Sequence, residues 1–291
     1  MNKKIIELSS VSFRYKKRQT LLEDLSLSLE CGRIHGLLGK NGEGKSTLMK
    51  LIGGLLFSQK GKISALGYQP EKRQSELLRE IYFLPEELPS FSVSIKNFEK
   101  MHAPFYPNFS TEQFNAYLKE FDIDSKEVKM NELSQGQTKK VMIAFALSAN
   151  TKILLMDEPT NGLDIPAKKQ FRRMVASSLN DERCMIISTH QVRDLDCLID
   201  SIVILDGHKI VLNETIENIT RKLLFRLSET NDKEDFVIYS EETLRGHHQI
   251  LENTEHEESK LDIELLFNAV LTNKKRIEEI FLKSKTPLNL P

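Results

Sequence analysis

The segment Gly39 to Thr47 constrains the fold of this 291-residue chain more than any other feature. It fits the pattern G-x-x-x-x-G-K-S/T, which requires a strand before it and a helix after it. The apolar run Ile34 to Leu38 supplies the strand, and apolar residues recur at helical spacing over Leu48 to Ile52. This order of strand, glycine loop and helix predicts an α/β fold with a mostly parallel sheet.

The residue types of this loop suit a chain of phosphates. Glycines let backbone N–H groups crowd around phosphate oxygens, and the following helix presents the positive end of its dipole. Lys45 offers a point charge to the β- and γ-phosphates, and Ser46 offers a hydroxyl to Mg²⁺. The motif alone does not separate an ATPase from a GTPase or a kinase. We expect the nucleotide to contact Gly39, Lys40, Asn41, Gly42, Glu43, Gly44, Lys45, Ser46 and Thr47.

Two adjacent carboxylates end a second apolar strand, Ile153 to Met156. Open α/β sheets bind ligands at the carboxyl ends of their strands, so Asp157 and Glu158 belong near the phosphate loop. We expect Asp157 to hold Mg²⁺ through water and Glu158 to polarise the water that attacks the γ-phosphate.

A third pattern, Leu133-Ser134-Gln135-Gly136-Gln137, precedes a long apolar run. Ser134 and Gln137 have the spacing of a capping box, which predicts a helix N-terminus with free N–H groups. Gly136 permits a close approach of another group. On spacing alone, an ordinary capped helix is the favoured interpretation of this segment.

The chain divides into recognisable parts. Alternating apolar residues predict antiparallel strands over the first 30 residues, and core strands are expected at Ile34 to Leu38, Ile81 to Leu84, Ile153 to Met156 and Cys184 to Ser188. The sequence Asp206-Gly207 predicts a hairpin. The fold class is therefore a P-loop NTPase core of mostly parallel sheet with an antiparallel β subdomain, an inserted α-helical subdomain and a small α+β C-terminal extension. We assign residues 1–213 to the nucleotide-binding domain, about 86–149 to its helical subdomain and 214–291 to an extension for dimerisation or regulation. In the extension we expect a strand at Phe236 to Tyr239 and a helix starting near Asp262.

Composition favours an ordinary globular protein, with 41 basic and 42 acidic residues and 40% hydrophobic content. No overall field favours nucleic acid or an anionic membrane. The longest apolar stretches fall short of the roughly 18–20 residues that span a bilayer, and the N-terminus lacks the pattern of a secretory signal. Cys31, Cys184 and Cys197 show no zinc spacing, and we interpret all three as packing residues in a reducing compartment. We therefore expect a cytoplasmic location.

Five elements in order closely resemble the nucleotide-binding domain of ABC-type ATPases. They are Gly39 to Thr47, Leu133 to Gln137, Ile153 to Pro159, Asn161 to Asp164 and Ser188 to His190. The resemblance covers roughly residues 4–213. It implies ATP and Mg²⁺ as ligands, and a head-to-tail dimer in which the N-terminus at Ser134 and Gly136 faces the γ-phosphate held by a partner.

The resemblance also assigns roles residue by residue. Tyr15 corresponds to the aromatic residue that stacks on adenine, although an edge-strand core tyrosine is the alternative. Asp164 corresponds to the acidic residue of a loop that communicates between the two sites. His190 corresponds to the histidine that contacts the γ-phosphate and orients the attack.

Two positions depart from the family pattern. Glu86 stands where the family usually has glutamine, which touches Mg²⁺ and the attacking water. A carboxylate there still suits Mg²⁺, but it adds negative charge near the γ-phosphate and donates no hydrogen bond when ionised. We expect Glu86 to be a working ligand. Glu43 is larger than the usual small residue, and we expect it to face solvent.

The leading function is the ATPase subunit of a transporter, placed on the inner face of the cell membrane with separate integral membrane permease subunits and a second ATPase subunit. The segment Leu261 to Ala269 resembles the C-terminal extension of a bacterial exporter subfamily, which favours export. No nucleic acid partner is expected. The alternative is a soluble clamp acting on DNA or ribosomes. Ribosome-acting relatives usually carry two such domains, but the chain has one phosphate loop. DNA-repair relatives have a long coiled coil between this loop and the family's signature segment, here Leu133 to Gln137, but the two are close in this sequence. A nucleotide-gated regulatory module with negligible turnover is a third possibility.

Overall fold

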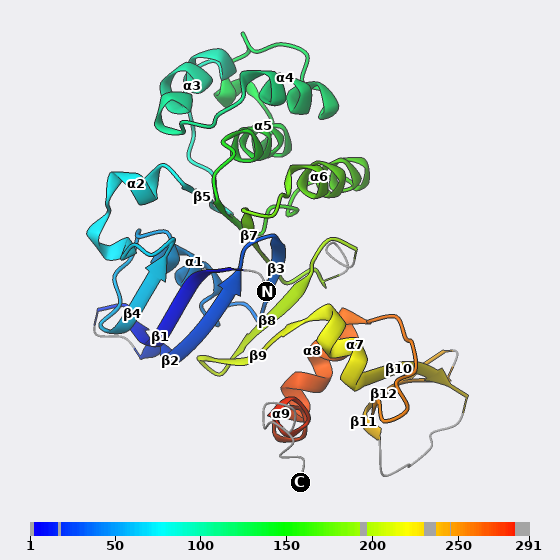
Figure 1. The fold of residues 1–291 in the computed structure, drawn as a ribbon. Helices are drawn as coiled ribbons and strands as arrows, with labels where there is room; N and C mark the ends of the chain where they lie inside the picture. Colours follow the sequence, from blue (N-terminus) through cyan, green and yellow to red (C-terminus); the bar gives the residue numbers. More distant parts are fainter. Residues whose placement is uncertain (1–2, 17–18, 193–196, 230–236, 245, 283–291) are drawn as a thin grey trace.

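A six-stranded, mostly parallel sheet lies at the centre of the computed structural model, which describes residues 3–16, 19–192, 197–229, 237–244 and 246–282 (Figure 1). Five strands run parallel and the last pairs antiparallel with its neighbour. The predicted core strands are confirmed. In spatial order they are β5 (Ile81–Leu84), β6 (Ile153–Asp157), β7 (Cys184–Thr189), β3 (Arg33–Leu38), β8 (Ser201–Asp206) and β9 (Lys209–Thr215).

A second, antiparallel sheet has the order β2-β1-β4. It contains β1 (Lys4–Arg14) and β2 (Thr20–Glu30), as predicted, and β4 (Lys60–Ala65), which was not. The phosphate-loop helix α1 (Lys45–Ile52) shares one buried cluster with both sheets, because Leu48, Met49 and Ile52 pack with core side chains from each. The loop before α1 is therefore held between the two sheets.

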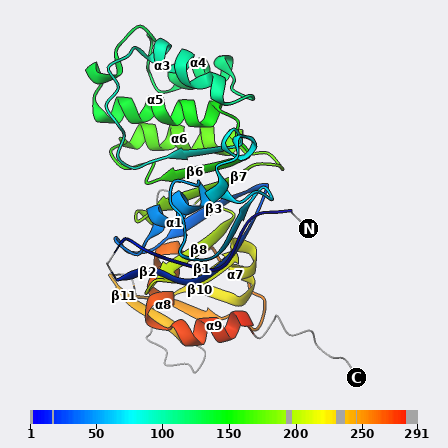
Figure 2. The ribbon, with the colours of Figure 1, turned by 90° about the vertical axis from the view of Figure 1, so that its left-hand side faces the viewer.

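The inserted subdomain is helical, as predicted. It contains α3 (Ile95–His102), α4 (Thr111–Glu120) and α5 (Gln135–Ser148), and the short α2 (Ser75–Leu78) precedes β5. Figures 1 and 2 both place α5 between the α3–α4 pair and α6 (Ile165–Ser178), with the central sheet beyond α6. Phe145 of α5 contacts the rings of Phe98, Phe109 and Phe114, so aromatic packing fixes the outer helices to α5.

A buried arginine joins the C-terminal ends of two of these helices. The Arg183 guanidinium donates to the Ser178 carbonyl of α6 at 3.1 Å and to the Leu147 carbonyl of α5 at 3.3 Å. Burial lowers the pKa of Arg183 to about 10. Its positive charge faces the negative ends of two helix dipoles, which stabilises the pair.

The C-terminal extension is a small α+β unit, as predicted, although β9 continues to Thr215, two residues beyond the predicted boundary. Its elements are α7 (Ile216–Lys222), the sheet β10-β12-β11, α8 (Ile263–Thr272) and α9 (Lys274–Leu282). Asp262 caps α8 through the Leu265 N–H at 2.9 Å, which confirms the predicted helix start. The predicted strand begins at Val237 as β11 (Val237–Thr243); Phe236 lies outside the described residues. The other strands, β10 (Leu223–Ser228) and β12 (Gly246–Glu252), were not predicted.

One hairpin turn connects the extension with the phosphate loop. The predicted turn forms with positive φ at Gly207 and His208. Lys274 of α9 makes an ion pair with Asp206, while the His208 N–H donates to the Glu43 carboxylate at 3.3 Å. The expectation that Glu43 faces solvent is therefore wrong, because its half-buried carboxylate caps this turn.

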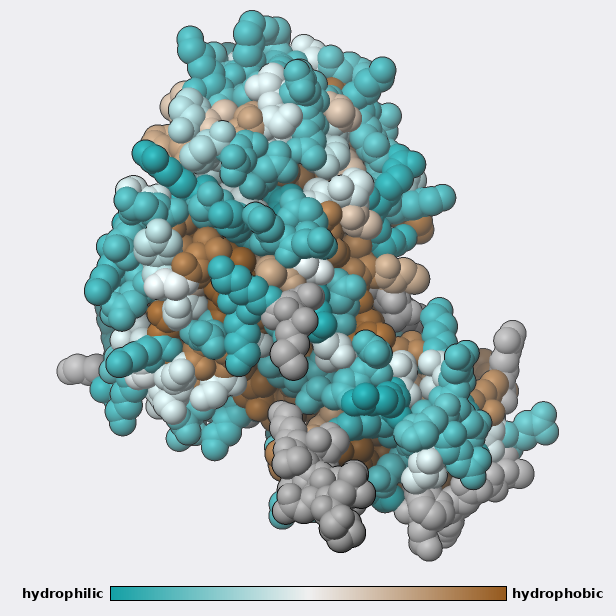
Figure 3. Space-filling view, in the orientation of Figure 1, coloured by the Kyte–Doolittle hydropathy of each residue, from teal (hydrophilic) through white to brown (hydrophobic). Residues whose placement is uncertain are grey.

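Two surface features complete the description. Hydrophilic side chains cover most of the face in Figure 3, and within the described residues no helix is both long and apolar enough to span a bilayer.

Cys184 is buried and Cys31 half-buried, but Cys197 is exposed in the turn before β8. The prediction that all three cysteines pack in the interior is wrong for Cys197, because the adjacent Leu198 and Ile199 fill the core instead.

Candidate functional site

Three distant parts of the sequence meet around one pocket of about 290 Å³. The phosphate loop forms one wall, and the ends of β5 and β6 supply three carboxylates to the other. The lining residues are Leu21, Asn41, Gly42, Gly44, Lys45, Ser46, Thr47, Glu86, Asp157 and Glu158. The predicted convergence of loop and strand ends is present in the geometry, whereas Gly39, Lys40 and Glu43 do not line this pocket.

The loop backbone leaves its donors available. Gly44 is the N-cap residue of α1 with φ 105°, and a Cβ there would lie 2.7 Å from Leu22, so only glycine fits. No side chain caps α1, so the N–H groups of its first turn stay open toward the pocket. This arrangement suits a phosphate group.

Lys45 is held over the loop from its own helix. Its ammonium donates to the Gly39 carbonyl at 2.7 Å and to the Lys40 carbonyl at 3.2 Å. Burial lowers the pKa of Lys45, and the nearby carboxylates of Glu158 and Asp157 oppose that shift. The carboxylates thus favour the charged ammonium that a triphosphate needs.

The strand-end carboxylates are fixed by a serine on the next strand. The Ser188 hydroxyl donates to Asp157 Oδ1 at 2.6 Å and accepts from the Glu158 N–H at 3.1 Å. Glu158 itself has φ 46°, a left-handed conformation that costs energy in a residue with a side chain. The Ser188 hydroxyl thus holds the Asp157 carboxylate and the backbone of Glu158.

Glu158 has the surroundings of a general base. Its Oε1 lies 2.8 Å from Nδ1 of His190, at the end of β7. Its Oε2 is buried and bonds to no atom among the described residues. A carboxylate oxygen buried without a partner beside the phosphate loop is available to accept a hydrogen bond from a water molecule.

The side chain of Glu86 faces the same pocket. The Asn161 amide donates to its carboxylate at 2.9 Å, and the Gln191 amide donates in turn to Asn161 at 3.1 Å. Lys139 was not predicted, yet its buried ammonium donates to the Glu158 carbonyl at 2.8 Å and approaches the Glu86 carbonyl at 3.4 Å. The sequence around Lys139 does not indicate these contacts, because Glu158 and Glu86 are 19 and 53 residues away from it.

The donor set fits Mg²⁺. The Ser46 hydroxyl and the carboxylates of Asp157 and Glu86 are hard oxygen ligands around one pocket. Within the described residues, no three His, Cys, Asp or Glu side chains form a metal-binding group. Mg²⁺ is commonly held by one or two carboxylates together with substrate phosphates and water.

Tyr15 lies beside the phosphate-loop helix. Its hydroxyl is 3.0 Å from the Thr47 hydroxyl, and its ring packs edge-on against Phe13. Tyr15 as a whole remains 38% exposed. Both readings of Tyr15 therefore keep a physical basis, since one edge packs on the sheet while the exposed part is open to stacking.

The signature segment lies outside the phosphate pocket. Its capping box is confirmed, with Ser134 Oγ accepting from the Gln137 N–H at 3.2 Å and the Gln137 side chain accepting from the Ser134 N–H at 3.0 Å. Gly136 lines a separate pocket of about 760 Å³. Asp164 caps α6 through the Ala167 N–H at 2.8 Å. One chain thus keeps its signature helix N-terminus apart from its own phosphate loop.

Known proteins share this arrangement. The ABC transporter family profile matches residues 22–161. The zinc uptake system ATP-binding protein ZurA of Listeria monocytogenes is 30% identical, over 69% of this chain and 82% of that protein. The Nod factor export ATP-binding protein I of Neorhizobium galegae is 29% identical, and the matched region covers 71% of this chain and 60% of that protein. A solved structure of the ATP binding subunit of an ABC transporter superposes with a TM-score of 0.68 at 26% identity, covering 75% of this chain and 92% of that one.

Proposed function

Because the chain belongs to the family of ABC transporter ATP-binding proteins, which are ATPases working with membrane permease components, we propose that two copies bind Mg-ATP head to tail and drive export. The observation that carries the dimer is the separation of the signature helix from the phosphate pocket. The helix α5 begins at the exposed Ser134, where the capping box uses the N–H groups of Ser134 and Gln137 but not those of Gln135 and Gly136, and the phosphate pocket of the same chain lacks these donors. A second copy would supply these donors and the positive end of the α5 dipole to the γ-phosphate.

Crosslinking tests this dimer. In a Cys197→Ser background, chains carrying Asn41→Cys are mixed with chains carrying Gln135→Cys, since both positions are exposed. We expect an ATP-dependent crosslink between the two chains. Lys275→Cys replaces Gln135→Cys in the matched control, because it is exposed on α9 in the extension. An equal yield with this control, or no crosslink with bound ATP, contradicts the proposed dimer.

In the proposed reaction, Lys45 and the loop N–H groups hold the β- and γ-phosphates. Glu158 accepts a proton from the attacking water through its unpartnered Oε2, and His190, bonded to Oε1, keeps that carboxylate in place. Ser46, Asp157 and Glu86 would hold Mg²⁺, which neutralises charge that develops during phosphoryl transfer.

A variant of Glu158 tests the catalytic assignment. We expect Glu158→Gln to lower steady-state phosphate release by about 100-fold or more while retaining ATP, because the amide keeps the shape but is not a base. The variant should accumulate as an ATP-bound dimer in size-exclusion chromatography. Glu87→Gln is the control, because Glu87 is an exposed glutamate next to Glu86 in the sequence, and its phosphate release should match that of the parent. Hydrolysis by Glu158→Gln at the parental rate removes Glu158 from this role.

The direction of transport is a proposal that rests on the C-terminal extension. The two named relatives are described as an uptake component and an export component, so they support transport without fixing its direction. The apolar helix α8 docks on β11 and β12, through residues that resemble an exporter subfamily. The permease complex would hold the subunit at the inner face of the cell membrane.

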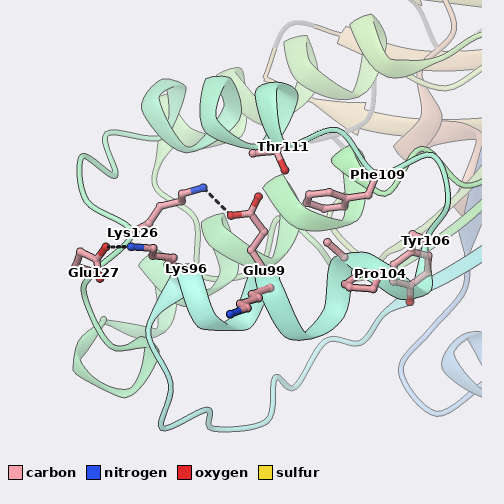
Figure 4. A pocket seen from close by; sticks show the side chains of 10 residues that line it. Lys96, Glu99, Pro104, Tyr106, Phe109, Thr111, Lys126 and Glu127 are labelled. Carbon is pink, nitrogen blue, oxygen red and sulfur yellow. Dashed lines mark hydrogen bonds and ion pairs between the residues drawn. The ribbon is translucent and has the colours of Figure 1, made fainter.

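We further propose that the permease contacts the outer helical layer. Met101 and Phe105 are 57% and 66% exposed there. Beside them lies a pocket of about 770 Å³ whose rim carries the ion pairs Lys126–Glu99 and Lys96–Glu127 (Figure 4). Co-purification from detergent-solubilised membranes, with identification of the bound permease, tests the partner. Loss of the permease in Phe105→Ser, with ATP binding retained, would support this surface; full retention would contradict it.

A further inference from the structure

Lys139 is a buried lysine beside the reacting groups, although it comes from the helical layer. It lies on α5, in the helical turn that follows the signature segment, and is only 6% exposed. Its ammonium reaches across to the strand ends, where it donates to the Glu158 carbonyl at 2.8 Å and approaches the Glu86 carbonyl at 3.4 Å. A lysine takes such a desolvated position only where its charge is compensated.

We propose that Lys139 is a positioning residue for ATP hydrolysis, which fixes the backbone of Glu158 and offsets the negative charge of the surrounding carboxylates. The inference rests on the role proposed above for Glu158. It adds a residue of the signature helix to the hydrolytic centre of the same chain.

Lys139 supports the backbone of Glu158. Glu158 has φ 46°, so its conformation must be held by its neighbours. Ser188 holds its N–H, and Lys139 and the Asn161 N–H hold its carbonyl at 2.8 and 3.3 Å. Lys139 is the charged donor of this set, and bonds to charged donors are roughly twice as strong as neutral ones. Without it, the peptide that aims the Glu158 carboxylate loses its strongest contact.

Lys139 also carries a positive charge close to three carboxylates. Three carboxylates, those of Glu86, Asp157 and Glu158, line a pocket that receives a polyanion. Lys45 lies on the phosphate side, and Lys139 lies behind the carboxylates on the side of α5. Burial lowers the pKa of Lys139, while Glu86, Glu158 and Asp157 oppose the shift in that order. The carboxylates therefore stabilise the charged form of Lys139, and Glu86 contributes most.

The experiment measures kcat and the Kd of Mg-ATP separately. We expect Lys139→Met to lower kcat about tenfold or more with the Kd within about threefold, because the side chain contacts the Glu158 backbone and not the phosphate loop. Lys139→Arg keeps the charge and should retain more than half of the kcat that Lys139→Met loses. Lys140→Met is the matched control, because the next lysine on α5 instead lies over the Phe121 ring and should leave kcat unchanged.

A double variant separates charge compensation from a merely structural role. Glu86→Gln removes the largest negative neighbour of Lys139 and keeps its shape. We compare the factor by which Glu86→Gln changes kcat in the two backgrounds. This factor should be at least about threefold larger in the Lys139→Met background than in the parent, because only without Lys139 is the charge of Glu86 uncompensated. Equal effects in both backgrounds would overturn the charge argument. Should Lys139→Met not fold, Lys139→Gln and Lys139→Arg replace it, and equal kcat in those two would overturn the same argument.

Glu158→Gln is measured in parallel. If it is inactive while Lys139→Met stays within about twofold of the parent, the inference about Lys139 is wrong and the proposed function stands. If Glu158→Gln retains parental hydrolysis, the proposed role of Glu158 is wrong, and the inference about Lys139 falls with it.

Discussion

Replacing Ser188 with alanine removes one hydroxyl that bonds both the Asp157 carboxylate and the backbone N–H of Glu158. In the parent, this hydroxyl donates to Asp157 Oδ1 at 2.6 Å in a buried environment. A hydrogen bond to a charged group contributes about 1.5–3 kcal/mol, so we expect the variant to lose about 2 kcal/mol of unfolding free energy. The Glu158 N–H keeps its second acceptor, the Ser188 carbonyl at 3.2 Å, and adds little to the loss. For a chain of this size the melting temperature should fall by about 3 °C.

The same substitution should slow hydrolysis, because Asp157 loses the partner that orients it. Loss of such a supporting bond commonly lowers activity about 10- to 100-fold. Differential scanning calorimetry and phosphate release at saturating Mg-ATP measure the two effects. Ser178→Ala is the control, because its buried hydroxyl donates to the Val175 carbonyl within its own helix. The reasoning is refuted if Ser188→Ala melts and turns over like the parent, or if Ser178→Ala produces the same losses.

Three further outcomes are expected. Lys45→Ala should abolish ATP binding in titration calorimetry, since it removes the charge above the loop; uptake with unchanged affinity would contradict this. Glu86→Ala should lower ATPase activity and weaken its dependence on Mg²⁺, and equal activity and Mg²⁺ dependence would show that Glu86 is not a ligand. Lys274→Met should make the extension more sensitive to limited proteolysis, because a partly buried ion pair with Asp206 contributes up to about 1 kcal/mol. Lys275→Met, at an exposed neighbour on α9, is the control, and equal sensitivity of the two variants would contradict the role of the pair.

Much of the core could be predicted because its signals are local. Continuous apolar runs such as Ile153 to Met156 become fully buried parallel strands, and the capping box at Ser134 depends only on neighbouring residues. The strands of the extension gave weaker signals. In β12, three buried residues follow the polar start Gly246-His247-His248, so the short apolar part lies inside a charged stretch. β4 contains two lysines and becomes a strand by pairing with β1.

The same distinction applies to the site. The phosphate loop and the strand-end carboxylates are contiguous motifs, so the sequence was enough to name them. The functions of Lys139, Ser188 and Asn161 depend on contacts with partners 19 to 75 residues away. Lys139 is one of several polar residues near the start of α5, and only the docking of α5 on the strand ends distinguishes it from Lys140.

The contacts of Arg183 have a mechanical consequence. Its bonds to the carboxyl ends of α5 and α6 make that end of α5 the natural pivot for any swing of the helical layer. With 14 residues, α5 is a lever roughly 21 Å long, and a tilt of about 10° would carry its far end by roughly 4 Å. Lys139, part of the way along, would travel roughly half to two-thirds as far, enough to break its 2.8 Å bond to Glu158. A small rotation of the outer helices would thus move the segment Leu133 to Gln137 furthest and would at the same time reach Glu158, the carboxylate proposed to activate water.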